Sequence, residues 1–281
     1  MEIPAMNIVL LKGDAMRVFC FACLFILLAV VAGAQTQTLV TYDDFDSGFI
    51  NPAKWNVFAP CATPTTYDCV REQRDEALRL GLRAYSSNTS DTGISFSESA
   101  VQFRNPGLIN TIQVKTTINS FSSASCPANP EAAHPQFLIS GAYFNTGSGN
   151  RQDDVQAYVM IERRTDDPSL PQSTLRVGAF MSVGSTFFNN VDLGTVQTGE
   201  EATLTLTWNR ASKTFVAQIV RQLTTPLVEQ QTMPYSQPDS LPPAFLFRQI
   251  QVGTYVPNCT ANVAFAAMKA RIGVVKVNAA L

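Results

Sequence analysis

Apolar and polar residues alternate along much of this chain with a period of two, the pattern of a β-strand with one buried face and one wetter face. The clearest example is the stretch 153–164, where one side carries Val155, Ala157, Val159 and Ile161. The other side carries Asp154, Gln156, Tyr158, Met160 and Glu162. Strands of this kind must stack one sheet on another to bury their apolar faces. We therefore predict an all-β fold, a two-sheet antiparallel β-sandwich.

The same alternation predicts further strands over 38–45, 77–84, 94–103, 108–121, 137–144, 174–183, 203–208, 214–220 and 264–277. The strands 203–208 and 214–220 flank the short polar link NRASK, which predicts a hairpin. A turn rich in Gly, Asn and Ser at 145–150 predicts a second hairpin, between 137–144 and the 153–164 strand. No stretch after residue 34 combines a sustained helical period with capping residues. The domain is therefore expected to be almost free of helix.

The N-terminus has the organisation of a secretory signal peptide. Arg17 precedes an apolar run of about 14 residues, 18–31, and the small residues Ala32-Gly33-Ala34 follow it. This run is shorter than the roughly 20 residues that a membrane-spanning helix needs. We predict a signal peptide over 1–34, a single β-sandwich domain over 35–281, and a secreted or periplasmic protein without a membrane partner after cleavage. The alternative is an uncleaved N-terminal anchor.

Composition excludes one class of partner. Charged residues make up 15% of the chain and the formal net charge is −2, whereas an average soluble protein has about 25% charged residues. The chain has no basic stripe of the kind that a nucleic-acid-binding surface needs. Nucleic acid is therefore not expected as a partner.

Removal of the predicted signal leaves four cysteines, Cys61, Cys69, Cys126 and Cys259. An even number of cysteines in an exported chain indicates disulfides, and four cysteines allow three connectivities. We favour Cys61 with Cys69, which closes a short loop, and Cys126 with Cys259, which ties distant segments together. A zinc site is the alternative, but the chain has no CxxC-type pair and its sole histidine, His134, lies far from these cysteines in sequence.

One segment resembles a known superfamily. In TYDDFDSGFINPAKWNVF, residues 41–58, acidic residues and Phe are followed by a short polar turn and then by Lys54-Trp55-Asn56. This pattern is similar to the N-terminal signature of the concanavalin A-like lectin/glucanase jelly rolls, which include secreted family 16 glycoside hydrolases. The stretch 264–277 resembles the closing strand that lies beside the first strand in such domains. The resemblance implies a jelly roll that binds or cleaves polysaccharides.

The chain departs from that superfamily in its catalytic residues. The resemblance implies a Glu-x-Asp-x-x-Glu-like cluster on the catalytic strand, and this sequence has none. On the strand that aligns with it, Asp154 and Glu162 are eight residues apart, roughly 26 Å, which is too far to act on one bond. His134 precedes Pro135, and we expect it to be an exposed loop residue rather than part of a catalytic triad. Catalysis is therefore not favoured.

No cofactor is predicted. Asp43, Asp44 and Asp46 cluster near a turn, and oxygen ligands near a turn suit Ca²⁺. The resemblance places a further carboxylate on the last strand, but 264–277 contains no Asp or Glu. We therefore favour solvated turn carboxylates over a structural calcium site.

The predicted function is recognition of a polysaccharide or glycan on the concave sheet. A pyranose presents an apolar face and a ring of hydroxyls, so aromatic and planar polar side chains suit it. On these grounds the candidate ligand-binding residues are Asp154, Gln156, Tyr158, Glu162 and Arg176. Trp208 shares a strand face with Leu204 and Leu206 and is assigned to the core. The alternatives are a structural or adhesive surface protein and, third, a divergent glycoside hydrolase or lyase.

Overall fold

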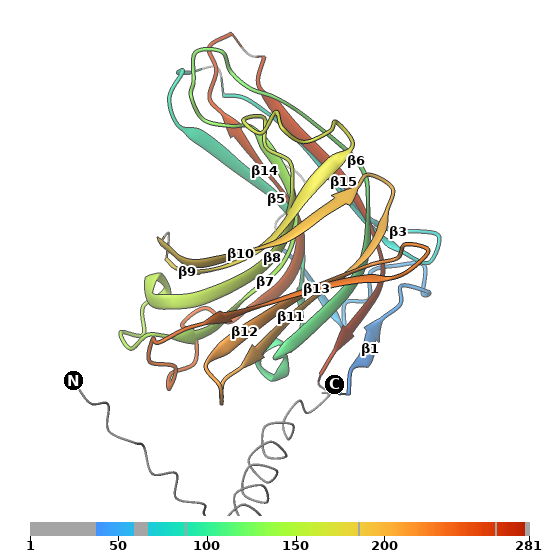
Figure 1. Ribbon diagram of the computed structural model, residues 1–281, viewed down its shortest axis with the longest axis vertical. Helices are drawn as coiled ribbons and strands as arrows, with labels where there is room; N and C mark the ends of the chain where they lie inside the picture. Colours follow the sequence, from blue (N-terminus) through green and yellow to red (C-terminus); the bar gives the residue numbers. More distant parts are fainter. Residues whose placement is uncertain (1–37, 59–66, 88, 185, 262, 279–281) are drawn as a thin grey trace, which may run out of the picture. The chain divides into compact units, whose positions relative to one another are not determined.

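The computed structural model describes residues 38–58, 67–87, 89–184, 186–261 and 263–278 (Figure 1). From Leu39 onward the chain forms one compact unit. The predicted signal peptide lies outside the described residues, as does Cys61. Within the described residues, no helix combines the length and apolar character required to cross a membrane.

The fold is a two-sheet antiparallel β-sandwich, as the alternation predicts. One sheet has the order β13-β12-β11-β6-β15-β4-β3, with β1 paired to β15. Its strands are β1 (Val40–Asp43), β3 (Tyr67–Gln73), β4 (Leu78–Tyr85), β6 (Thr111–Ala124), β11 (Glu201–Asn209), β12 (Thr214–Arg221), β13 (Leu227–Pro234) and β15 (Phe265–Val277).

The second sheet has seven strands in the order β10-β9-β8-β7-β14-β5-β2, and Figure 1 shows β7 to β10 running side by side. Its strands are β2 (Trp55–Phe58), β5 (Ile94–Phe103), β7 (His134–Asn145), β8 (Asp154–Glu162), β9 (Thr174–Val183), β10 (Thr186–Gln197) and β14 (Arg248–Pro257). The helical elements of the described residues are two single 3₁₀ turns, η1 (Pro106–Leu108) and η2 (Arg151–Asp153).

The core lies between the two sheets and is built by the alternating apolar residues. On β8, Val155, Ala157, Val159 and Ile161 are all buried. The opposing sheet contributes Leu78, Leu80 and Leu82 from β4 and Ile112 and Val114 from β6. Burial of these side chains removes apolar surface from water and is the main stabilising term of the fold.

The two ends of the domain meet as the resemblance implies. Val40 of β1 pairs with Val277 of β15. Near this junction Trp55 is buried, and its Nε1 donates a hydrogen bond to Asp43 at 2.6 Å. The Asp43 carboxylate also accepts the backbone N–H of Phe45 and forms an ion pair with Lys54. Asp43 is therefore a buried structural carboxylate, which corrects the expectation of a solvated turn residue, whereas Asp44 and Asp46 are exposed.

The predicted disulfide between Cys126 and Cys259 is confirmed. It closes a loop with a sequence separation of 133 residues and joins the β6–β7 loop to the segment after β14. Cys69 lies on β3, and its predicted partner Cys61 is outside the described residues.

Candidate functional site

A groove of about 880 Å³ lies on the outer face of the seven-stranded sheet, on the side away from the core. It is lined by the side chains that alternate with the core residues of β5, β14, β7, β8, β9 and β10. Strand pairing arranges these side chains in rows that cross the sheet. One row joins six strands through the register partners Gln102, Gln249, Ser140, Tyr158, Phe180 and Asn190. Its five strand spacings span about 24 Å.

The centre of this row is an aromatic pair. The rings of Tyr158 and Phe180 stack with centroids 4.6 Å apart and 22° between their planes. Phe187 packs edge-on against Phe180 at 5.0 Å. The Tyr158 hydroxyl donates a hydrogen bond to Oε1 of Gln156, and burial raises the pKa of Tyr158 to about 12. Tyr158 is therefore a neutral hydroxyl at physiological pH, on a ring that is only partly buried.

Amide side chains continue the row on the other half of the sheet. Nε2 of Gln102 donates to Oε1 of Gln249 at 3.1 Å, and Gln249 in turn donates to Gln251. Gln136 and Gln156 line the same groove. An amide can donate and accept hydrogen bonds at once, so this lining can hydrogen-bond a series of hydroxyl groups.

A second aromatic row lies toward one end of the groove. The Tyr255 ring packs between Phe96, at 4.7 Å, and His134, at 4.5 Å and 21°. Nδ1 of His134 lies 3.2 Å from the carbonyl oxygen of Ala132, and burial lowers the pKa of the imidazole. His134 is thus the first residue of β7 and a half-buried, neutral part of the groove. The expectation of an exposed loop histidine was wrong, because β7 begins three residues earlier than its sequence pattern indicates.

Besides Glu131, two carboxylates lie in the groove, and burial raises the pKa of both Glu98 and Glu162. The strand register places them in one row, Glu98–Gly253–Gln136–Glu162. Three strand spacings therefore separate their backbones, about 14 Å. Glu98 and Glu162 therefore lie on different strands, β5 and β8, unlike the single-strand carboxylate cluster that the resemblance implies.

Three of the five residues that the sequence nominates line this groove, namely Gln156, Tyr158 and Glu162. Asp154 is 1% exposed. Its carboxylate accepts hydrogen bonds from the backbone N–H groups of Ala244 and Phe245, so it anchors the segment that leads into β14.

Arg176 lies opposite Glu162 in the register of β8 and β9, but its guanidinium pairs with Asp167. It does not line the groove. The structure thus separates Asp154 and Arg176 from the other three candidates.

Among the described residues, Asp91, Cys126 and Cys259 form a cluster of potential metal-ligating groups. The two cysteines form the disulfide, so they cannot supply the thiolates that a metal ion needs. The Asp91 carboxylate accepts hydrogen bonds from the backbone N–H and the hydroxyl of Thr260.

Most residues that line the groove were not nominated from the sequence. Gln249, Gln251 and Tyr255 lie on β14, Glu98 and Gln102 on β5, and Phe180 on β9. β14 was not predicted, although Gln249 and Gln251 alternate with Ile250 and Val252. That two-residue period is the signal that was available. The pairing of β14 with both β5 and β7 is the information that the sequence lacked.

No protein-family model and no curated protein matches this sequence. Solved structures do match. An immunostimulatory antigen and pseudo β-1,3-glucanase of Mycobacterium tuberculosis matches with 16% identity over 85% of this chain and 98% of that chain, at a TM-score of 0.43. A marine PL-14 alginate lyase from Aplysia kurodai matches with 9% identity over 75% of this chain and 86% of that chain, at a TM-score of 0.39.

A winged bean acidic lectin complexed with methyl-α-D-galactose also matches, with 11% identity over 76% of this chain and 94% of that chain, at a TM-score of 0.36. At these identities and TM-scores the matches carry no argument about ligand or activity. The sheet topology of the chain itself confirms the predicted architecture, a two-sheet antiparallel β-sandwich in which the first strand pairs with the last.

Proposed function

We propose that this chain is a secreted, non-catalytic protein that binds a polysaccharide or glycan in the groove of the seven-stranded sheet. The observation that carries the proposal is the stacked pair of Tyr158 and Phe180 beside a row of glutamine amides. Aromatic faces pack against the apolar face of a pyranose, and planar amides hydrogen-bond its hydroxyls. Fold alone does not define function, so the proposal depends on this site.

Two features support a binding role over a catalytic one. The sequence lacks the carboxylate cluster of the hydrolases that it resembles. In the groove, Glu98 and Glu162 lie on different strands with two strands between them, whereas the catalytic cluster that the resemblance implies lies on a single strand. A groove that spans six strands suits a chain of several sugar units better than a single small molecule.

A glycan array with the purified protein tests the proposal, followed by affinity electrophoresis in gels that contain the best polysaccharide. Tyr158→Ala is the diagnostic variant. Tyr85→Ala is its matched control, because Tyr85 is a 41% exposed tyrosine on β4 of the other sheet. We expect Tyr158→Ala to abolish retardation while Tyr85→Ala leaves it unchanged, with both variants folded as judged by thermal melting.

The remaining outcomes decide between the alternatives. If no glycan binds and the protein self-associates or attaches to surfaces, the structural or adhesive role replaces the proposal. Release of reducing ends or of unsaturated sugars from a polysaccharide panel would establish a hydrolase or a lyase instead. N-terminal sequencing of exported protein tests secretion, and a mature chain that begins at Gln35 is the expected result.

A further inference from the structure

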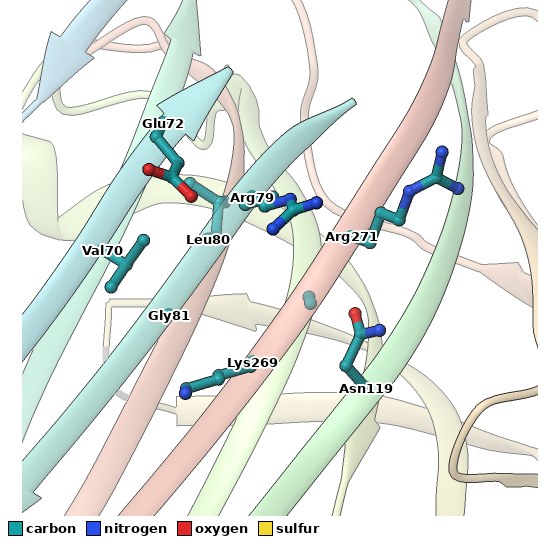
Figure 2. Close-up of a pocket in the computed structure, with 9 residues that line it drawn as sticks. Val70, Glu72, Arg79, Leu80, Gly81, Asn119, Lys269 and Arg271 are labelled. Atoms are coloured by element: carbon teal, nitrogen blue, oxygen red, sulfur yellow. The ribbon is translucent and has the colours of Figure 1, made fainter. Parts of the chain in front are cut away.

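The eight-stranded sheet also carries a depression on its outer face, on the far side of the core from the proposed glycan groove. It has a volume of about 370 Å³ and lies over β3, β4, β15 and β6 (Figure 2). Its lining includes three cations, Arg79, Lys269 and Arg271, together with Glu72 and the amide of Asn119. No part of the proposed glycan site uses these residues.

The strand register opposes two of the cations directly. Arg271 of β15 pairs with Arg79 of β4, and both side chains are on the outer face, as Figure 2 shows. Like charges directly opposite each other in an antiparallel pair destabilise the sheet. Asp75 lies between β3 and β4, and its carboxylate forms an ion pair with Arg79. Arg271 contacts only the backbone of this residue: its Nη2 donates a hydrogen bond to the carbonyl oxygen of Asp75 at 3.4 Å.

Lys269 is the next outward residue on β15 and is exposed. Among the residues that the structure describes, no carboxylate is within ion-pair range of Lys269 or Arg271. By contrast, Lys115 on the neighbouring strand β6 pairs with Glu201 at 2.8 Å. Two adjacent cations on one strand are therefore left without a protein counter-ion.

A β-bulge adds a hydrogen-bond donor to this pair of cations. On β6, Ser120 pairs with Lys269 and Ile118 pairs with Ala270, so Asn119 is an extra residue between the two pairings. Bulges re-aim side chains and are enriched beside functional sites. Here the exposed side chain of Asn119 is on the same face as Lys269 and Arg271 (Figure 2).

Gly81 provides the space for the depression. It pairs with Lys269 across the strands, and a Cβ at this position would lie 3.3 Å from Cβ of Val70 and 3.5 Å from Cγ of Lys269. Because Gly81 has no side chain, the aliphatic part of Lys269 can lie over β4 (Figure 2). The depression is thus formed by the pairing of β4 with β15.

The geometry points to an oxyanion site, in which Lys269, Arg271 and Asn119 bind a sulfate group, either as the free ion or as the sulfate ester of an anionic polysaccharide. Ammonium, guanidinium and amide N–H groups are all donors, and charge-assisted bonds to oxyanions are the stronger kind. The bound anion would also give Lys269 and Arg271 the counter-ion that Arg79 already has in Asp75. This site is independent of the glycan groove, since it lies on the other sheet.

Affinity electrophoresis of the full chain in gels with dextran sulfate, and in gels with unmodified dextran, tests the inference at low ionic strength. The variants are Arg271→Gln, Lys269→Gln and Asn119→Ala. Lys276→Gln is the matched control, because Lys276 is an exposed lysine on the same strand but outside the depression. Arg271→Gln and Lys269→Gln are expected to weaken binding about tenfold, the loss for one charge-assisted hydrogen bond. Lys276→Gln should change it less than about twofold.

Competition separates the two sources of the anion. If sodium sulfate displaces dextran sulfate better than sodium chloride of equal ionic strength, the site takes the free ion. If it does not, the polymer is the ligand. Absence of retardation in dextran sulfate overturns the inference. It is equally overturned if Lys276→Gln weakens binding as much as Lys269→Gln, because the attraction then comes from the general charge of the sheet.

Discussion

Tyr158 and Phe180 stack across two neighbouring strands of the seven-stranded sheet, on the face opposite the core. Their rings face the groove because each residue alternates with buried core residues, Val159 on β8 and Ala179 on β9. Both rings are only partly buried, so part of their aromatic surface is available to a ligand. The Tyr158 hydroxyl donates a hydrogen bond to Gln156, and the Phe180 ring packs edge-on against Phe187. This pair is the centre of the proposed binding surface.

Phe180→Ala is expected to weaken glycan binding about two- to twelvefold, the range for an aromatic contact of roughly 0.5–1.5 kcal/mol. The loss follows because Tyr158 would no longer be held by its stacking partner. Isothermal titration with the best glycan from the array measures it. Phe49→Ala is the control, since Phe49 is 59% exposed and outside the groove. Equal affinity of Phe180→Ala and the unaltered chain would remove the aromatic pair from the binding surface.

Glu98→Gln and Glu162→Gln are expected to raise the free energy of unfolding at pH 7. Burial raises the pKa of both carboxyls above the ordinary value of 4.5, so each carboxyl keeps its proton to higher pH in the folded state than in the unfolded chain. The contribution of each carboxyl to the free energy of unfolding is therefore fully present below pH 4.5. It is lost as the pH rises through the pKa that the carboxyl has in the folded state. Urea unfolding at pH 4 and pH 7 should show an advantage of the variants at pH 7 that disappears at pH 4.

Glu76→Gln is the control for that experiment, because Glu76 is exposed in the turn between β3 and β4. Its effect should be small and equal at both pH values. A Glu98→Gln variant that is less stable than the unaltered chain at pH 7 would mean that the charged carboxylate is stabilised by its surroundings, such as Arg151.

Gly141→Ala is expected to destabilise the fold by about 1–3 kcal/mol, the usual cost of overpacking. A Cβ at Gly141 would lie 2.3 Å from Cδ of Arg248 and 2.9 Å from the Phe247 carbonyl oxygen. Arg248 cannot move aside freely, because it is 2% exposed and its guanidinium lies 3.6 Å from the centre of the Tyr143 ring. Gly273→Ala is the matched control, since the nearest atom to its Cβ is 3.9 Å away. Chemical denaturation should show a lower free energy of unfolding for Gly141→Ala than for Gly273→Ala.

Replacement of both Cys126 and Cys259 by serine is expected to lower stability by about 2–5 kcal/mol, because the disulfide limits the unfolded chain over a long loop. His134 begins the strand after Cys126 and Tyr255 lies four residues before Cys259. We therefore expect glycan binding to fall as well. Denaturation and titration of the double variant measure the two effects. Unchanged stability would mean that the loops at this end are held by packing and hydrogen bonds alone.

The local alternation of apolar and polar residues was sufficient to predict the class of fold. The alternation on β8, on β5 and on the β11–β12 hairpin predicted these strands, and the core residues Val155 to Ile161 were assigned to the correct face. Period-two burial is a property of a strand and its immediate sequence, so it can be read without knowledge of the partners. The strands that were not predicted either have little apolar alternation, such as β10 and β13, or are buried on both faces, as is most of β14.

The sequence by itself determined a two-sheet sandwich and the buried face of its central strand. It also nominated Gln156, Tyr158 and Glu162, and it favoured the pairing of Cys126 with Cys259 among three connectivities, which the structure confirmed. Only the tertiary structure decided that β14 lies between β5 and β7, and so that Gln249, Gln251 and Tyr255 join these three residues in one groove. It likewise decided that Asp154 is buried and that Arg271 opposes Arg79. The physical reason is that strand order and register are set by contacts between residues far apart in the chain, which local periodicity does not contain.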